Sequence, residues 1–331
     1  MGKIVNVILS GGVGSRLWPL SRKSKPKQYL PIFSGKSLFE LAVDRNSRIA
    51  QEVLLVASES NLELANPALQ GVSHRIVVES VPRNTAAAIA FAAFALEKDD
   101  VMLVTPSDHL VENQEDYKSA IEHGVKFAEK DNIVTFGIVP HYPETGYGYI
   151  EHEGNDVISF REKPNESTAK EFLQRKRFLW NSGIFCFKAG VFLEELERYS
   201  PAVFLAAKEA FQNSKEDIID KELSLAIPSI SVDYAVMEKS DRIKVVPAKF
   251  KWSDMGAFDS LYEHLKDNGH PTDENGNMVI GDTDKEIAFV GLKDTIVVST
   301  DDALLVLDMN SAQKVKDLYE SLQENNSDLI E

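Results

Sequence analysis

Short apolar runs rich in β-branched residues recur through the first 140 residues, and helical patterns separate them. The runs are IVNVIL from Ile4, VLLVAS from Val53, RIVVES from Arg75, VMLVT from Val101 and IVTFGIV from Ile133. Runs of this length that end at turn residues are typical of buried strands. Their alternation with helices predicts an α/β fold with a mixed, mainly parallel sheet and helices on both faces.

Two helix starts are indicated by side chains that can bond to free backbone N–H groups. Ser37 and Glu40 form a capping-box pattern ahead of LFELAVDRNSRIA. Asn84 and Thr85 precede the alanine-rich AAAIAFAAFALEK and are expected to cap it. The small residues of this second helix suit close packing against a sheet.

The regular alternation ends near residue 140. Three later segments are predicted to be strands that extend the sheet or lie at its edge: YGYIEHEG, VISFREKP and FLWNSGIFCF. Helical patterns follow from Gly190 to Phe211. The polar stretch KDNGHPTDENGN then predicts a linker. We therefore expect one large domain over residues 1–265.

A small C-terminal segment is expected over residues 266–331. EIAFVGLKDTIVVSTDDALLVL predicts two or three short strands with turns at Lys293-Asp294 and Asp301-Asp302. A helix is expected from Ser311. The segment should therefore be rich in β-strands and end in a helix.

Composition limits the classes of partner. The chain has 331 residues, 43% of them hydrophobic, which is enough to bury a sizeable core. Its net charge of -16 disfavours nucleic acid or an anionic membrane as a general partner. The single cysteine, Cys186, lies in the apolar run GIFCF and offers neither a disulfide framework nor a metal quartet. No signal peptide precedes MGKIVNVILSGG and no apolar segment approaches the roughly 18 residues that span a bilayer, so a cytoplasmic location is expected.

The glycine-rich stretch LSGGVGSRLWPLSRKSKPKQYLPI follows the first strand directly. Glycines in this position let the backbone approach a phosphate, and their N–H groups can bind an anion. The P-loop pattern is absent, and Leu17 stands where a dinucleotide-binding fingerprint needs a third glycine. Pro19 predicts a long wrapping loop from Gly11 to Pro31, which would bring Arg16 and Lys27 to one site.

The string GGVGSRLWPLSR…PKQYL resembles the signature of the sugar-nucleotide pyrophosphorylases. LWPLSR and PKQYL in particular are similar to segments of mannose-1-phosphate guanylyltransferases. The resemblance continues in order through VESVPRNTAAAIA, TPSDH, PETGYGYIE, FREKP, FLWNSGIF, SVDYAVMEKS and WSDMGAF, over nearly all of residues 1–265. It implies a Rossmann-like nucleotide-diphospho-sugar transferase fold. It also implies transfer of GMP from GTP to mannose 1-phosphate, with GDP-mannose and pyrophosphate as products.

The chemistry of such a transfer agrees with the charged residues of these motifs. A sugar phosphate that attacks the α-phosphorus of a triphosphate needs the repulsion between two anions screened, and positioned charge does most of this work. Arg16 suits the β- and γ-phosphates, and Lys27 suits the α-phosphate or the sugar phosphate. Asp108, after the strand VMLVT, and Asp254 can bind Mg²⁺, as the resemblance also implies. His109 is expected to pack or to donate a hydrogen bond.

Residues for the nucleotide extend beyond the loop. Glu79 could accept hydrogen bonds from the N1–H and N2 amino groups of guanine, and Asn84 could contact the base or a phosphate. Ala87 stands where the family usually has proline. The full set expected to bind the nucleotide is Gly11, Gly12, Gly14, Ser15, Arg16, Lys27, Glu79, Asn84, Thr85 and Asp108.

The hexose and its phosphate are expected to contact the middle of the chain. Glu162 and Asn181 can pair with hydroxyl groups, Lys163 can meet the sugar phosphate, and Gly146 leaves room for the ring. The aromatic residues Tyr147, Tyr149 and Trp180 line this site or belong to the core, and the sequence leaves both open.

Two alternative functions remain open from the sequence. One is the same reaction with another nucleoside triphosphate or hexose 1-phosphate. The other is a regulatory protein that senses GDP-mannose without catalysis, although such a protein should lose the phosphate-facing or metal-binding residues, and none is missing.

The chain ends too soon for an isomerase domain, so no isomerase activity is expected. The short strands from Glu286 to Leu307 should cap the first domain or form a homodimer contact.

Overall fold

The computed structural model describes residues 2–281 and 283–331, and residues 1 and 282 lie outside this description. The chain forms two compact units. The first contains the residues up to Gly11, Ala42–Ser107 and Val111–Trp252, and the second contains Gly12–Leu41, Asp108–Leu110 and Ser253–Glu331. The second unit is thus built from three segments that are far apart in the sequence. The division of the chain at residue 265 stays a prediction.

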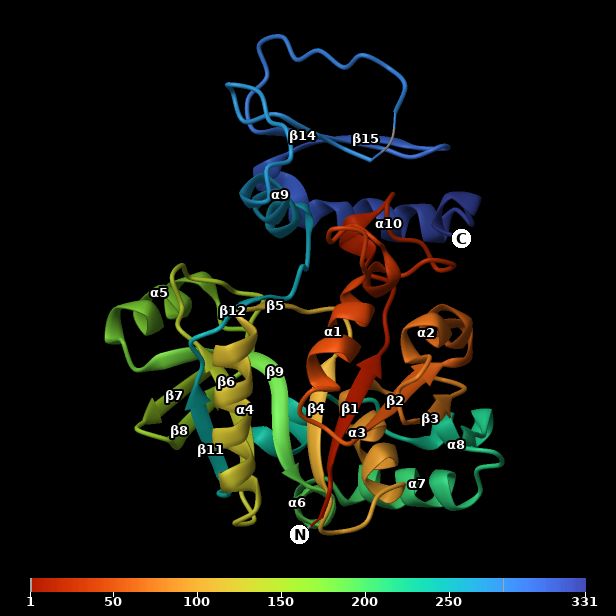
Figure 1. Cartoon of the computed structure of the whole chain (residues 1–331), viewed down its shortest axis with the longest axis vertical. Coiled ribbons are helices and arrows are strands. Elements are labelled where there is room, and N and C mark those ends of the chain that lie inside the picture. Colours follow the sequence, from red (N-terminus) through yellow and green to blue (C-terminus); the bar gives the residue numbers. More distant parts are fainter. Residues whose placement is uncertain (1, 282) are drawn as a thin grey trace. The chain divides into compact units, whose positions relative to one another are not determined.

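A mixed sheet of ten strands forms the centre of the first unit (Figure 1). The strand order is β10-β3-β2-β1-β4-β9-β6-β11-β8-β7. In chain order the strands are β1 (Ile4–Ser10), β2 (Glu52–Ser58), β3 (His74–Glu79), β4 (Val101–Pro106), β6 (Ile133–Ile138), β7 (Tyr149–Glu153), β8 (Asp156–Arg161), β9 (Phe178–Lys188), β10 (Ile218–Ile219) and β11 (Ile243–Pro247). The five strands expected from the apolar runs are all present, which confirms the predicted α/β class.

One strand lies elsewhere than the sequence indicates. The strands β1 to β4 pair in parallel, but β9 runs antiparallel between β4 and β6 in the middle of the sheet. The expectation that FLWNSGIFCF extends or edges the sheet is therefore wrong for β9, whereas β7 and β8 do lie at an edge. Eight of the eleven residues of β9 are buried, because a central strand is covered on both faces.

Helices pack on both faces of this sheet. Met102 and Val104 of β4 belong to an apolar core that also contains residues of α3, α6 and α7. Val101 and Leu103 point the other way, into a second core that contains residues of α4 and α5. The helices of the first unit are α2 (Leu62–Leu69), α3 (Asn84–Phe94), α4 (Gln114–Ala128), α5 (Glu166–Arg175), α6 (Ala189–Tyr199), α7 (Pro201–Gln212) and α8 (Lys221–Ala226), and α1 spans Leu38–Asn46.

The capping box ahead of α1 is confirmed, but the caps expected for α3 are wrong. Ser37 N donates to Glu40 Oε2 at 2.7 Å, and Glu40 N donates to Ser37 Oγ at 3.2 Å. Asn84 has a φ of 67° and its Oδ1 accepts from Thr85 N, one residue on. The Thr85 hydroxyl accepts from Val232 N at 2.9 Å instead of capping the helix. A tertiary contact has thus taken the place of a local one.

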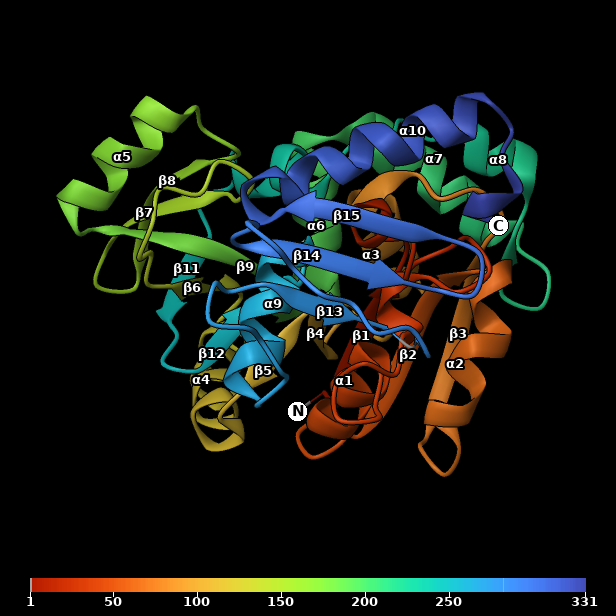
Figure 2. The same ribbon diagram turned by 90° about the horizontal axis from the view of Figure 1, so that it is seen from above.

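The second unit has its own small sheet and its own apolar core. The strands β13 (Met278–Ile280), β14 (Thr295–Ser299) and β15 (Leu304–Asp308) lie side by side, and helices α9 (Phe258–Asp267) and α10 (Val315–Glu324) accompany them (Figure 2). The core joins residues of these elements to Leu17, Trp18 and Phe33 of the glycine-rich segment. Separately, β5 (Leu110–Glu112) pairs with β12 (Lys251–Ser253).

The C-terminal segment is rich in strands and ends in a helix, as predicted, but its first strand lies earlier than expected. The apolar residues EIAFVG from Glu286 form no strand, and β13 begins at Met278, directly after the expected linker. The linker itself is ordered by Asp273, whose carboxylate accepts from Asn275 N and from both the backbone and the side chain of Asn277. None of the helices in the described residues combines the length and apolar character that crossing a bilayer requires.

Candidate active site

The glycine-rich loop that follows β1 leaves room for a lysine from farther along the chain. Gly12 and Gly14 have φ angles of 82° and 77°, which other residues seldom adopt. A Cβ atom on Gly14 would lie 2.4 Å from the Cβ of Lys27, so only glycine fits there. The fully described stretch from Gly11 to Pro31 contains two 3-10 turns and no α-helix, as predicted.

A cavity of about 530 Å³ lies within the second unit. Most residues expected to handle phosphates and metal line it: Gly12, Gly14, Ser15, Arg16, Lys27, Asp108 and Asp254. Gly11 is exposed and belongs to the first unit. The structure therefore brings together four charged residues that are up to 238 positions apart in the sequence, Arg16 and Asp254 being the farthest.

Lys27 and Asp108 form a largely buried ion pair at this cavity. Lys27 Nζ lies 2.8 Å from Asp108 Oδ2 and also donates to the backbone carbonyl of Asp254 at 2.8 Å. Lys27 is only 5% exposed. Burial works to raise the pKa of Asp108, but the Lys27 ammonium and His109 outweigh it, so the pKa lies below its ordinary value. Asp108 therefore carries its charge at neutral pH.

Asp254 is held in place by the turn that follows it. Its Oδ1 accepts from Gly256 N at 3.1 Å, and a Cβ on Gly256 would lie 2.7 Å from Asp254 Oδ2. Met255, between them, has a φ of 47°, which is strained for a residue with a side chain. The strain and the obligatory glycine fix the carboxylate on the wall of the cavity.

The two carboxylates of the cavity suit a hard divalent cation whose remaining ligands come from substrate and water. Asp108 and Asp254 supply carboxylate oxygens to one cavity, and the described residues contain no cluster of three or more His, Cys, Asp or Glu arranged for a metal. Mg²⁺ is commonly bound by one or two carboxylates, with phosphate oxygens and water in the remaining positions. The two carboxylates of this cavity match that pattern.

Several residues of the cavity were missed by sequence reasoning. Lys23, Gly256, Tyr319 and Gln323 also line it. His109, expected to have a supporting role, lines it as well, with Nε2 at 3.7 Å from Asp108 Oδ1. Lys23 and Gly256 carried a sequence signal, because Lys23 lies in the glycine-rich stretch after β1 and Gly256 lies two residues after Asp254 in WSDMGAF.

Glu79 is a buried carboxyl at the end of β3 in the first unit. Its Oε1 has no hydrogen-bond partner among the residues that the structure describes. Burial raises the pKa of Glu79 to about 7, although a hydrogen bond with the backbone of Arg83 opposes the shift. The carboxyl is therefore close to half-protonated at neutral pH, and its free oxygen is able to accept a bond from a ligand.

Replacing Glu79 with glutamine should change how stability depends on pH. A carboxyl with a pKa near 7 in the folded state and 4.5 in the unfolded state binds more protons when folded, so its contribution falls as pH rises from about 4.5 to 7. Glu79→Gln removes this loss. We expect the variant to gain roughly 2–3 kcal/mol relative to wild type between pH 5 and pH 8. Urea unfolding at both pH values measures it, and an equal difference at both would contradict the assignment.

Three of the four residues expected at the sugar phosphate lie together in the first unit. Lys163 Nζ lies 2.9 Å from Glu162 Oε1. A Cβ on Gly148 would lie 2.6 Å from Glu162 Oε2 and 3.4 Å from the Cβ of Asn181. Gly146, by contrast, is exposed and donates to Glu144 Oε1 at 2.7 Å. Gly148 therefore makes space beside Glu162 and Asn181, and the place expected for Gly146 at the hexose stays a prediction.

Asp233 orients Asn181, a role that the sequence motifs did not predict. Asn181 Nδ2 donates to Asp233 Oδ1 at 3.1 Å, while its Oδ1 accepts from the Thr135 hydroxyl at 3.0 Å and from Gly183 N at 3.2 Å. Burial and the neighbouring carboxylate of Glu162 raise the pKa of Asp233 to about 6. Since the amide oxygen is already occupied twice, Asn181 can offer a ligand only its second N–H.

The aromatic residues of this region belong mainly to the core. Tyr149 is fully buried and Trp180 is 2% exposed. Tyr147 is partly buried and packs edge-on against Trp180 and Trp252, with ring centroids 5.4 and 5.1 Å apart. These rings therefore support β9, which carries Asn181, and β7, which directly follows Gly148.

Comparison with known proteins agrees with this arrangement. Residues 5–269 match the family described as Nucleotidyl transferase, and residues 272–322 match one described as MannoseP isomerase/GMP-like beta-helix domain. The mannose-1-phosphate guanylyltransferase of Salmonella muenchen is 37% identical over 98% of this chain and 75% of its own length. That of Escherichia coli is 35% identical over 97% of this chain and 74% of its own.

A solved structure matches almost end to end. The crystal structure described as mannose-1-phosphate geranyltransferase from Thermus thermophilus superposes with a TM-score of 0.84 at 31% identity, covering 97% of this chain and 99% of that one. The matched family spans four-fifths of the sequence, and the relatives align over nearly all of it. The chain therefore belongs to the nucleotidyl transferase family.

Proposed function

We propose that this protein transfers GMP from GTP to mannose 1-phosphate, forming GDP-mannose and pyrophosphate. The observation that carries the proposal is the cavity in which Arg16, Lys27, Asp108 and Asp254 meet. A site with two cations and two carboxylates suits the meeting of two anions around a divalent metal. Relatives at 35–37% identity that bear the name mannose-1-phosphate guanylyltransferase support the choice of base and sugar.

The reaction is an in-line displacement at phosphorus. An oxygen of the mannose 1-phosphate forms a bond to the α-phosphorus of GTP, and the bond from that phosphorus to the bridging oxygen breaks. Pyrophosphate leaves with the electron pair. The attacking oxygen is already ionised, so no general base is required. Arg16 screens the β- and γ-phosphates, and Lys27 screens the α-phosphate or the incoming phosphate.

The family generally uses a divalent metal, and we propose that it is Mg²⁺ in this protein. Asp108 and Asp254 would hold it. When bound, the metal neutralises charge on the phosphates. The Lys27 ammonium meanwhile holds one oxygen of Asp108 at 2.8 Å, which orients that carboxylate and keeps it ionised.

Residues of the first unit are proposed to choose the base and the hexose. Glu79 accepts from guanine through the oxygen that lacks a protein partner. Asn84 and Thr85, at the start of α3, are proposed to contact the nucleotide, Asn84 from its exposed position. Glu162 accepts from a sugar hydroxyl, and Lys163 meets the sugar phosphate.

Release of pyrophosphate from GTP and mannose 1-phosphate in excess Mg²⁺ tests the proposal. We expect release with this pair and a kcat/KM well above that for UTP, dTTP or glucose 1-phosphate. A higher kcat/KM for another pair would assign the same reaction to other substrates. Binding of GDP-mannose without any turnover would instead indicate a regulatory protein.

Two further features stay predictions. A cytoplasmic location is expected from the sequence.

Self-association as a homodimer is favoured by β15, an edge strand whose outward residues Leu304 and Val306 are 64% and 56% exposed. Light scattering in solution measures the mass that decides it.

A further inference from the structure

One wall of the cavity comes from Lys23 and from helix α10. Lys23, Tyr319 and Gln323 line the cavity that also contains Arg16 and Lys27. We infer that Lys23, Tyr319 and Gln323 bind the β- and γ-phosphates of GTP and the pyrophosphate that leaves. The inference rests on the proposed function, since that reaction releases pyrophosphate from a triphosphate in this cavity.

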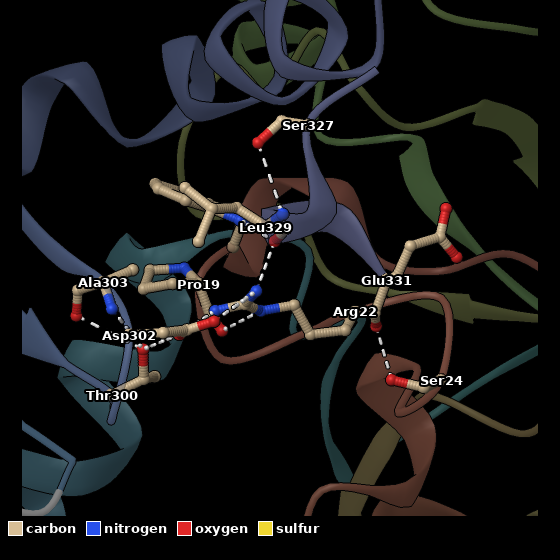
Figure 3. A network of polar contacts seen from close by, with 10 residues as sticks. Pro19, Arg22, Ser24, Thr300, Asp302, Ala303, Ser327, Leu329 and Glu331 are labelled. Atoms are coloured by element: carbon tan, nitrogen blue, oxygen red, sulfur yellow. Dashed lines mark hydrogen bonds and ion pairs between the residues drawn. The ribbon is translucent and has the colours of Figure 1, made fainter.

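The C-terminal residues hold the glycine-rich segment in place. Arg22 Nε donates to the carbonyl of Pro19 at 3.0 Å, its guanidinium pairs with both oxygens of Asp302, and Nη1 donates to the carbonyl of Leu329 (Figure 3). Trp18 Nε1 donates to the same Leu329 carbonyl at 2.8 Å. The turn predicted at Asp301-Asp302 therefore anchors the segment that carries Arg16 and Lys27.

The same docking places Lys23 at the cavity. Lys23 N donates to the carbonyl of Ile330 at 2.9 Å, so its backbone is fixed while its side chain stays 42% exposed. The ammonium pairs with the carboxylate of Glu331 at 2.7 Å, and that carboxylate is 62% exposed. An exposed pair of this kind is weak, and a phosphate with more charge can replace the carboxylate. Glu331 thus stands where a phosphate oxygen would bind.

Helix α10 adds two neutral donors to the same wall. Tyr319 is 5% exposed, and its hydroxyl has no hydrogen-bond partner among the residues that the structure describes. A buried hydroxyl without a partner is uncommon and marks a group that a ligand can satisfy. Gln323 follows one helical turn later on the same face, is exposed, and carries an amide that can donate to phosphate.

The additional wall brings a further cation to the cavity. Lys27 is held by Asp108 at 2.8 Å and is proposed to face the α-phosphate or the sugar phosphate. Arg16 and the proposed metal then face the β- and γ-phosphates, which carry several negative charges near neutral pH. Lys23 supplies a second cation at the end of the cavity formed by α10. Positioned cations on the leaving group are a main source of rate in phosphoryl transfer.

Calorimetric titration of the full chain with inorganic pyrophosphate and Mg²⁺ tests the inference without any turnover. We expect the Kd to rise about tenfold in Lys23→Ala and several-fold in Gln323→Ala and Tyr319→Phe. Lys23→Arg should restore most of the affinity, because it keeps the charge. Glu331→Gln should tighten binding two- to threefold, because it removes the competing carboxylate. In the reverse reaction, Lys23→Ala, Tyr319→Phe and Gln323→Ala should raise KM for pyrophosphate and leave KM for GDP-mannose unchanged.

Matched controls separate binding from folding. Lys25→Ala removes an exposed lysine of the same segment and Glu324→Ala an exposed residue of the same helix, neither of which lines the cavity, so both should bind pyrophosphate like wild type. Equal Kd values for Lys23→Ala and Lys25→Ala, with unchanged unfolding temperatures, would overturn the inference. If wild type and variants bind pyrophosphate as expected but GDP-mannose is not turned over, the proposed function fails, while the binding of pyrophosphate by Lys23, Tyr319 and Gln323 stands.

Discussion

Lys27→Met is expected to lower kcat/KM for GMP transfer by about a thousandfold. The lysine is 5% exposed and its ammonium bridges the Asp108 carboxylate and the Asp254 carbonyl at 2.8 Å each. Methionine keeps most of the volume but removes both bonds and the charge that is proposed to face the phosphates. Steady-state rates of pyrophosphate release measure the effect.

Loss of folding is the competing explanation for such a result. Removing one partner of a buried ion pair leaves the other uncompensated and costs about 3–5 kcal/mol. The double variant Lys27→Met/Asp108→Asn removes both charges and should recover much of that stability while staying inactive. Lys25→Met, in the same segment but exposed, should keep full activity. A stable single variant with activity near wild type would contradict the role of Lys27.

The sequence predicts what depends on neighbours along the chain. The strands β1 to β4 and β6, the capping box at Ser37 and the loop ahead of Pro31 follow from local patterns of apolar residues, hydroxyls, glycine and proline. The failures are equally physical. The start of α3 depends on the Thr85 hydroxyl, which bonds to Val232 N, 147 residues away. A pattern read over a few residues contains no information about such a partner.

Recognition of the motifs extended the prediction to the candidate site, yet only to residues inside the motifs. Lys27, Asp108 and Asp254 were expected together and line one cavity. Tyr319 and Gln323 line the same cavity from an amphipathic helix whose sequence is typical of a surface helix. Their position depends on how the C-terminal segment packs on Leu17 and Trp18. Only the folded chain reveals it.

The choice between two glycines shows the limit within a motif. TGYGY offers Gly146 and Gly148 at a spacing of two, and the sequence favoured the first. Gly148 immediately precedes β7, and its carbonyl accepts from Asn181 N at 2.8 Å. This bond brings Gly148 so close to Glu162 and Asn181 that a Cβ atom on it would meet both side chains. The pairing of β7 with β9 places Gly148 there, and the position of β9 was itself predicted wrongly.

Asp254→Asn is expected to lower kcat by about a hundred- to a thousandfold, with little change in stability. The substitution removes one negative ligand from the proposed metal site. It leaves the Lys27 bond intact, since Lys27 donates to the backbone carbonyl of Asp254 and not to its carboxylate. The asparagine Oδ1 can still accept from Gly256 N. Rates measured against Mg²⁺ concentration should show a higher half-saturating concentration as well as a lower maximum.

Asp108→Asn is the informative partner of this variant, because the two carboxylates differ in what they touch. Asp108 pairs directly with the buried Lys27 ammonium, so its loss should reduce both activity and the free energy of unfolding, by about 3 kcal/mol. Asp254→Asn should reduce activity alone. A chelator should abolish the activity of wild type, and added Mg²⁺ should restore it. If Asp254→Asn keeps wild-type rates at limiting Mg²⁺, then Asp254 is no metal ligand and the two carboxylates do not act together.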